Sequence, residues 1–171
     1  QMQREHELND LFENSLKGHD FQVYFQPKIL LDSQNIGGAE ALVRWEHPRR
    51  GMIFPSDFIP LFEKNGKICK LDLYVFEEVC KTILRWKEEG RRLFPISVNL
   101  SRQHFKREDC LKQFEEIAAR YQVPKELIEL ELTESVFFDD QGIEYVKKQI
   151  DEMHRSGFQC SLDDFGAGYS S

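Results

Sequence analysis

The spacing of hydrophobic residues along this chain changes several times between the period of a helix and the period of a strand. In residues 2–17, leucine and phenylalanine recur at helical spacing among charged residues, which predicts an amphipathic helix that ends near Gly18. In residues 21–27 the character of the side chains alternates and several of them are aromatic, which predicts a strand that Pro27 closes. Residues 36–45 are rich in small residues and are expected to form a second strand, against which another element packs closely.

From residue 55 onward, helices and strands are expected to alternate along the chain, joined by short connections. The expected helices span residues 55–65, 71–86, 111–121 and 143–153, and the expected strands span residues 95–101, 127–134 and 158–163. Ser56 is the expected N-cap of the first of these helices, while Gly66, Gly90 and Gly157 are expected to end three of them. This alternation predicts a parallel sheet built from βαβ units.

Two architectures fit that order of elements, an open doubly wound sheet and a (β/α) barrel. On each of the last three strands, polar residues share one face and apolar residues share the other. The polar faces consist of Ser97, Asn99 and Ser101, then Glu129, Glu131 and Thr133, and then Ser161 and Asp163. Strands covered by helices on both faces are normally apolar throughout, so this polar row favours a barrel whose lumen holds a polar site.

Composition narrows the class of protein without identifying its chemistry. At 171 residues, with 40% hydrophobic and 31% charged residues, the chain is expected to be one soluble globular domain. Its net charge of −7 argues against a nucleic acid polymer as partner, so an anionic ligand would need metal ions or well-placed arginines. The four cysteines lack zinc-ligand spacing, and no apolar run reaches the roughly 20 residues of a membrane span. We therefore expect a cytoplasmic domain, which leaves a membrane-anchored parent protein open.

Oxygen-bearing side chains collect toward the carboxyl ends of the expected strands. They are Glu40, Asn99, Glu131, Glu134, Asp163 and Asp164. Active sites of barrels lie at these strand ends, and an all-oxygen set without histidine or cysteine suits Mg²⁺ or Mn²⁺. Two alternatives stay open. The adjacent aspartates form a solvated turn, or the carboxylates pair with arginines such as Arg44 and Arg102.

Five short motifs follow one another in a specific order along the chain. They are Gln26-Pro27, Glu40-Ala-Leu-Val-Arg-Trp45, Val98-Asn-Leu-Ser101, Glu131-Leu-Thr-Glu-Ser135 and Asp163-Asp-Phe-Gly-Ala-Gly-Tyr-Ser-Ser171. Together they resemble the EAL domain family of cyclic di-GMP phosphodiesterases, and the resemblance runs through essentially the whole chain. It implies a TIM-like (β/α)₈ barrel with an antiparallel first strand, incomplete here with about five strands. It also implies hydrolysis of cyclic di-GMP to linear pGpG.

The resemblance assigns roles to individual residues. The implied ligands of one divalent metal are Glu40, Asn99, Glu131 and Asp163, and the implied ligand of a second metal is Asp164. Glu134 would orient the loop after the last strand, and with Glu40, Glu131, Asp163 and Asp164 it completes the implied catalytic set. Arg44 would contact a phosphate, while Gln26, Leu42 and Asp72 would line the nucleotide pocket. Ala167 stands where the family commonly has threonine, a departure that removes no ligand.

The resemblance also sets expectations about domain organisation. Residues 1–17 are expected to form a helix that enters from an upstream sensory or diguanylate cyclase domain, and residues 18–171 the first two thirds of an EAL domain. A full barrel of this type has roughly 240 residues, and the family's later motifs do not occur in this chain. We therefore expect negligible hydrolysis by the chain alone. An unpaired edge strand is expected to recruit a second copy, giving a homodimer or another self-associated form.

Two functions from different classes compete. One is a phosphodiesterase, and the other is a receptor or signalling module that binds cyclic di-GMP without cleaving it. Members of the family that lose activity usually lack the glutamate of the Glu-Ala-Leu motif or a ligand aspartate. Because Glu40, Asp163 and Asp164 are all present, the enzyme is favoured for the parent protein. A third class, an unrelated Mg²⁺-dependent barrel such as an enolase-like lyase, would share the ligands but not the five ordered motifs.

Overall fold

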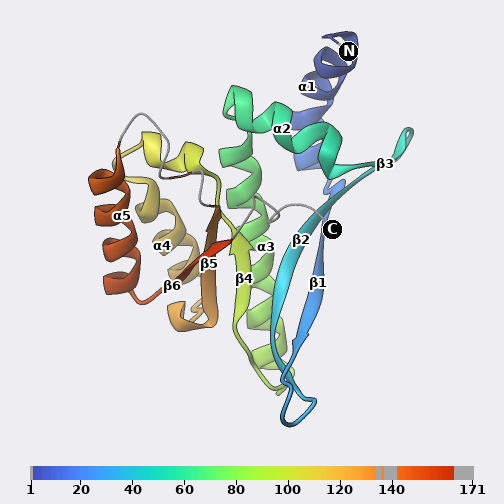
Figure 1. Cartoon of the computed structure of the whole chain (residues 1–171). Coiled ribbons are helices and arrows are strands. Elements are labelled where there is room, and N and C mark those ends of the chain that lie inside the picture. Colours follow the sequence, from blue (N-terminus) through green and yellow to red (C-terminus); the bar gives the residue numbers. More distant parts are fainter. Residues whose placement is uncertain (1, 134–135, 137–141, 164–171) are drawn as a thin grey trace.

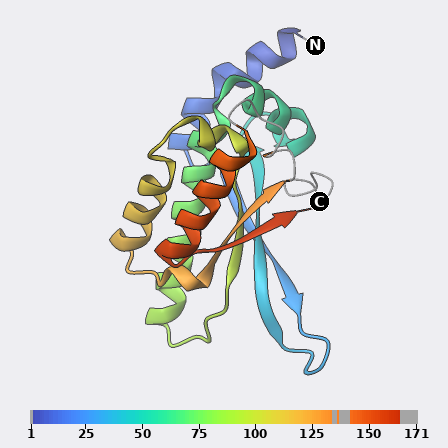
Figure 2. The ribbon, with the colours of Figure 1, turned by 60° about the vertical axis from the view of Figure 1, so that its left-hand side comes forward.

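A computed structural model describes residues 2–133, 136 and 142–163, with Asp163 described by its backbone alone. Within these residues a twisted sheet has the strand order β1-β2-β4-β5-β6, and β3 pairs with β2 alone. The helices α3, α4 and α5 lie on one side of this sheet (Figures 1 and 2). Strands β2, β4, β5 and β6 are mutually parallel, whereas β1 is antiparallel to β2. The expected antiparallel first strand is therefore confirmed.

The elements follow the expected order closely. The strands are β1 (Phe21–Ile29), β2 (Ile36–His47), β3 (Gly51–Ile53), β4 (Ile96–Asn99), β5 (Ile128–Thr133) and β6 (Gln159–Asp163). The helices are α1 (Met2–Lys17), α2 (Pro55–Asn65), α3 (Ile68–Glu88), α4 (Cys110–Arg120) and α5 (Ile143–Ser156). Two short 3₁₀ helices span Arg102–Lys106 and Lys125–Leu127. The 3₁₀ helices and β3 were not predicted, because such short segments carry little periodicity.

Two local predictions were wrong for identifiable reasons. Pro27 does not close β1, which continues to Ile29. Within the described sheet β1 is an outer strand, where a proline can be accommodated without breaking a central ladder. Ser56 is not the N-cap of α2, because Phe54 occupies that position without a side-chain hydrogen bond. Pro55 begins the helix instead, where its fixed φ is already helical and its missing N–H costs nothing.

A cluster of aromatic rings forms one end of the hydrophobic core. Trp45 of β2 is fully buried, and its ring lies against Phe21, Phe58 and Phe62, with centroids 4.6 to 5.9 Å apart. Phe12 of α1 packs against the same cluster at 4.7 Å from Phe62. The indole nitrogen of Trp45 also donates a hydrogen bond to the Ser15 hydroxyl of α1 at 3.0 Å. Helix α1 therefore contributes to the core of this domain.

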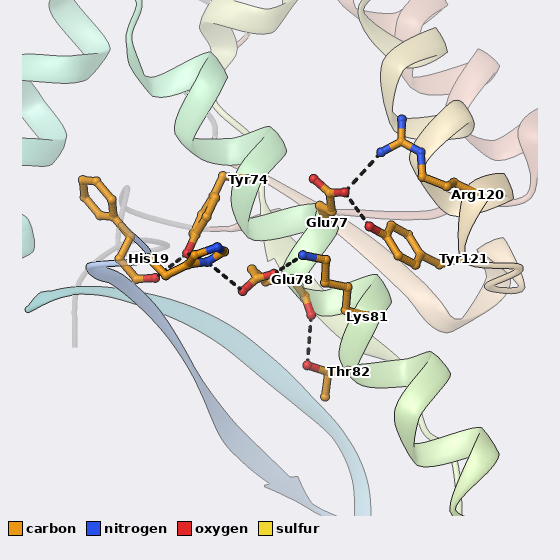
Figure 3. Close-up of polar contacts among 9 residues, drawn as sticks. His19, Tyr74, Glu77, Glu78, Lys81, Thr82, Arg120 and Tyr121 are labelled. Carbon is orange, nitrogen blue, oxygen red and sulfur yellow. Dashed lines mark hydrogen bonds and ion pairs between the residues drawn. The ribbon is translucent and has the colours of Figure 1, made fainter. Parts of the chain in front are cut away.

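Helix α3 is held on the sheet by polar contacts along its outer side (Figure 3). The Tyr74 hydroxyl donates to the backbone carbonyl of Phe21 at 2.9 Å, which ties α3 to the start of β1. One turn along, Glu77 accepts hydrogen bonds from Arg120 at 3.1 Å and from Tyr121 at 2.6 Å. These contacts anchor α3 between β1 and α4, and the opposite side of the helix carries Asp72 into the interior. None of the helices described is long and apolar enough to span a lipid bilayer.

Candidate functional site

Polar side chains from β1, β4, β5 and β6 meet on one face of the sheet, which we call the lumen face because a barrel would turn it inward. The Lys28 ammonium donates a hydrogen bond to the Ser97 hydroxyl at 2.7 Å, and Ser97 donates to the Glu129 carboxylate at 2.9 Å. Ser161 donates to the same carboxylate oxygen at 3.1 Å, and Lys28 lies 3.9 Å from it. Strands β1, β4, β5 and β6 thus converge on one carboxylate. We name Lys28, Ser97, Glu129 and Ser161 the floor layer.

Of the predicted metal ligands, Asn99 ends β4 and Glu131 lies near the end of β5, whereas Glu40 lies in the first half of β2 and is the register neighbour of Ser97. Asn99 is cross-strand neighbour to Glu131, and Glu131 is neighbour to Ser161. Asn99 is buried, whereas Glu131 and Glu40 are half-buried. The predicted ligand Asp164, the predicted catalytic residue Glu134 and the loop with Ala167 lie outside the described residues, as does the side chain of Asp163.

The described residues alone do not assemble a metal site. Among them, no group of three or more histidine, cysteine, aspartate or glutamate side chains could hold a metal ion. The predicted ligand set also includes the amide of Asn99, which is described, and the carboxylates of Asp163 and Asp164, which lie outside the described part of the chain. The donors that are described, Glu40, Asn99 and Glu131, offer oxygen atoms alone, and this chemistry fits Mg²⁺ or Mn²⁺.

A small cavity opens where β2 and β4 part. Their pairing consists of Ala39 with Ile96 and Glu40 with Ser97, and it stops there. Beyond this point residues of α3 contribute to the wall between the two strands. The cavity is lined by Ala41, Leu42, Val43, Leu71, Asp72, Val75 and Asn99. It therefore brings together three residues that were predicted to take part in the site, from three different elements.

Asp72 is held in a buried polar network beside this cavity. Its carboxylate accepts a hydrogen bond from the backbone N–H of Ser101 at 2.9 Å and lies 2.9 Å from the ring nitrogen Nε2 of His104. The Ser101 hydroxyl donates to Glu63 at 2.7 Å. Asp72, Ser101 and His104 are each no more than 3% exposed. The network therefore fixes the chain immediately after Asn99.

Burial and pairing have opposite effects on His104. Burial alone would lower its pKa, but the hydrogen bonds and charges of Asp72 and Cys69 outweigh burial and raise the pKa of His104 to about 9. Burial also raises the pKa of Glu63, although its bond from Ser101 acts in the opposite direction. Neither His104 nor Glu63 was expected at the site. His104 lies 32 positions from its partner Asp72, and Glu63 lies 38 positions from its partner Ser101, so no local pattern could have paired them.

Gln26 and Arg44 lie on the lumen face of the β1–β2 ribbon. Gln26 is the cross-strand neighbour of Glu40, and Arg44 follows Glu40 by four residues, so all three share one face. The side chain of Arg44 donates to the backbone carbonyl of Val43 at 3.0 Å. The predicted phosphate contact and the predicted ligand Glu40 are therefore on the same surface, with Leu42 between them.

Comparisons with known proteins identify the family of this chain. A family model described as EAL domain matches residues 9–171. The bifunctional diguanylate cyclase/cyclic di-GMP phosphodiesterase MucR of Pseudomonas aeruginosa is 34% identical over 164 residues, which cover 96% of this chain and 24% of MucR. The cyclic di-GMP phosphodiesterase PdeR of Escherichia coli is 31% identical over the same shares of the two chains.

The fold has close counterparts among solved structures. A structure described as PaMucR phosphodiesterase in complex with c-di-GMP superposes with a TM-score of 0.84 at 32% identity, covering 96% of this chain and 66% of that one. The EAL domain of FimX from Xanthomonas citri superposes with a TM-score of 0.80 at 19% identity, covering 94% of this chain and 61% of that one, which supports the fold alone. The chain spans about a quarter of the length of MucR and PdeR.

Proposed function

This chain belongs to the EAL domain family, and on that premise we propose that its parent protein hydrolyses cyclic di-GMP to linear pGpG with the help of divalent metal ions. The observation that carries the proposal is the lumen face itself. Oxygen donors from β2, β4 and β5 share one polar face of the sheet with the floor layer, and Asn99 and Glu131 lie near the carboxyl ends of their strands. That is where barrel enzymes place their active sites.

We assign the metal ligands as the motifs imply. Glu40, Asn99, Glu131 and Asp163 would hold one Mg²⁺ or Mn²⁺ ion, and Asp164 would help to hold a second. Divalent ions bound there would lower the pKa of a water molecule and offset the negative charge that builds up on the phosphodiester. Their charge would also make an acidic surface attractive to a dianionic dinucleotide, in a chain with a net charge of −7.

The chain's own residues would bind and orient the nucleotide. Arg44 would contact a phosphate, because a guanidinium forms paired hydrogen bonds with phosphate oxygens. Leu42 and Gln26 lie beside it on the same face and would line the pocket. The position of Asp72 beside the cavity supports a place near the ligand, but its carboxylate already accepts from Ser101 and lies against His104. Its contribution is therefore to shape the pocket wall.

Calorimetry and chromatography on the same samples test the proposal. The 171-residue chain would be titrated with cyclic di-GMP in Mn²⁺ and in EDTA, and each sample analysed for pGpG. We expect binding that requires Mn²⁺ and weakens at least about tenfold in Glu40→Gln, which replaces one charged ligand. Glu88→Gln, at an exposed position at the end of α3, is the matched control and should bind normally.

Measurements of turnover and binding with the full parent protein would distinguish an enzyme from a receptor. Turnover to pGpG by the parent, and its loss in Glu40→Gln, would support a phosphodiesterase, whereas tight binding without turnover would identify a receptor. A folded chain that binds no cyclic di-GMP in either buffer would contradict both functions. Negligible turnover by the 171-residue chain alone is the expectation drawn from the motifs it contains.

Two macromolecular partners are proposed on separate grounds. MucR is a bifunctional protein that includes a diguanylate cyclase, which supports an upstream domain of that class or a sensory domain in the parent. Strand β6 is an outer strand of the described sheet, and such edges tend to pair with another chain. Light scattering at micromolar concentration would contradict a homodimer if it gave the mass of a single chain.

A further inference from the structure

Tyr24 places an aromatic ring on the lumen face of β1. Along this strand, Phe21 and Phe25 pack toward the core and α3, with Phe25 lying 5.8 Å from the ring of Trp86. Residues of the other parity face the lumen, as the bond of Lys28 to the floor layer demonstrates. Tyr24 has the parity of Lys28 and is 49% exposed. Its ring therefore lines the open space above the floor layer.

The register places this ring among the predicted substrate-binding residues. Tyr24 is the direct cross-strand neighbour of Leu42, and the next pair along the ribbon is Gln26 with Glu40 on the same face. Side chains directly opposite each other have Cβ atoms about 5 Å apart, and diagonal neighbours about 7 Å apart. Tyr24 therefore stands within the reach of one nucleotide from both Arg44 and Glu40.

A hydrogen bond holds the ring at its polar end. The Tyr24 hydroxyl donates to the Glu46 carboxylate of β2 at 2.7 Å. Glu46 has the same parity on β2 as Leu42 and Arg44, so the bond runs along the lumen face. The hydrogen bond and the negative charge of Glu46 raise the pKa of Tyr24. The ring is thus anchored at one edge while its face stays accessible.

We infer that Tyr24 stacks on one guanine base of cyclic di-GMP and is a substrate-binding residue outside the sequence motifs. This inference rests on the proposed function. A purine presents a flat π surface, and an aromatic side chain whose face is accessible is the usual platform for it. Tyr24 is the cross-strand neighbour of Leu42 and a diagonal neighbour of Arg44, so a nucleotide whose phosphate bound Arg44 would have its base within reach of the Tyr24 ring.

Three variants of the 171-residue chain test the stack, titrated calorimetrically with cyclic di-GMP in Mn²⁺. Tyr24→Ala removes the ring and should weaken binding about 5- to 100-fold, the range that follows from losing one base–aromatic stack. Tyr24→Phe keeps the ring but loses the bond to Glu46, and should stay within about threefold of the parent chain. Tyr121→Ala is the matched control, because Tyr121 also bonds to a glutamate, but on the helical side of the molecule (Figure 3).

A fluorescent readout distinguishes stacking from an indirect effect. An analogue of cyclic di-GMP that contains 2-aminopurine should lose fluorescence on binding to the unsubstituted 171-residue chain and to Tyr24→Phe. When Tyr24→Ala is saturated with the same analogue, the loss of fluorescence should be smaller. Equal affinity and equal quenching for the unsubstituted 171-residue chain and Tyr24→Ala would overturn the inference while leaving the proposed function intact. If the unsubstituted 171-residue chain were folded but did not bind cyclic di-GMP, the proposed function itself would be overturned.

Discussion

Replacing His104 with glutamine should flatten part of the pH dependence of this protein's stability between pH 6.5 and 9. His104 is 3% exposed, and its Nε2 atom lies 2.9 Å from the Asp72 carboxylate. The pKa of His104 rises from the ordinary histidine value of 6.5 to about 9 in the folded chain. The folded state therefore holds a proton that the unfolded state has already released in this interval, so rising pH favours unfolding.

The size of the effect follows from linkage. One pKa unit corresponds to about 1.4 kcal/mol, so the free energy of unfolding should fall by about 1.4 kcal/mol per pH unit in this window. The total change is about 3 kcal/mol for a shift from 6.5 to about 9. The stabilisation is fully present below pH 6.5 and is lost as the pH rises through 9. In His104→Gln this contribution is absent at every pH.

Urea unfolding at half-unit steps from about pH 6 to about pH 9.5 measures this prediction. Fluorescence of Trp45 and Trp86 together with circular dichroism would report the transition, and the difference between the parent chain and His104→Gln isolates the histidine. His154→Gln, which removes an exposed histidine at the end of α5, should show the full slope. Two curves that stay parallel across the whole range would refute the assignment of a protonated His104 to the folded state.

Two further substitutions test the packing that supports the site. Glu129→Leu removes the carboxylate on which the floor layer converges and leaves Lys28 facing an apolar side chain, so we expect a loss of about 2 kcal/mol in urea unfolding. An unchanged urea midpoint would mean that the floor layer contributes no stability. Gly38→Ala would place a Cβ atom 3.0 Å from the Pro95 carbonyl oxygen. Because β2 would have to move away from Pro95, the free energy of unfolding should fall by about 1 to 3 kcal/mol. A melting temperature equal to that of the parent chain would contradict this close approach.

The order of the elements was predictable because local geometry dictates it. Periods of 3.6 and 2 are properties of the backbone, so the amphipathic stretches around Phe114 and Leu130 became α4 and β5 as expected. Gly66 and Gly90 ended their helices because the left-handed conformation, at φ values of 84° and 72°, suits glycine. Pro27 was misjudged because its cost depends on whether its strand is an outer or a central one, which is a property of the sheet.

The residues of the proposed site were predicted from motifs, whereas the contacts among the residues around it could not be. Residue type and order were sufficient to select Glu40 and Asn99 as oxygen donors on one face of a parallel sheet. The contact between Lys28 and Ser97 joins residues 69 positions apart, and the contact between Asp72 and His104 joins residues 32 positions apart. Such pairs arise only after strand register and helix packing are set, because a side chain's charge and hydrogen-bonding capacity do not specify its distant partner. The tertiary structure alone decided that one aspartate is buried against a histidine.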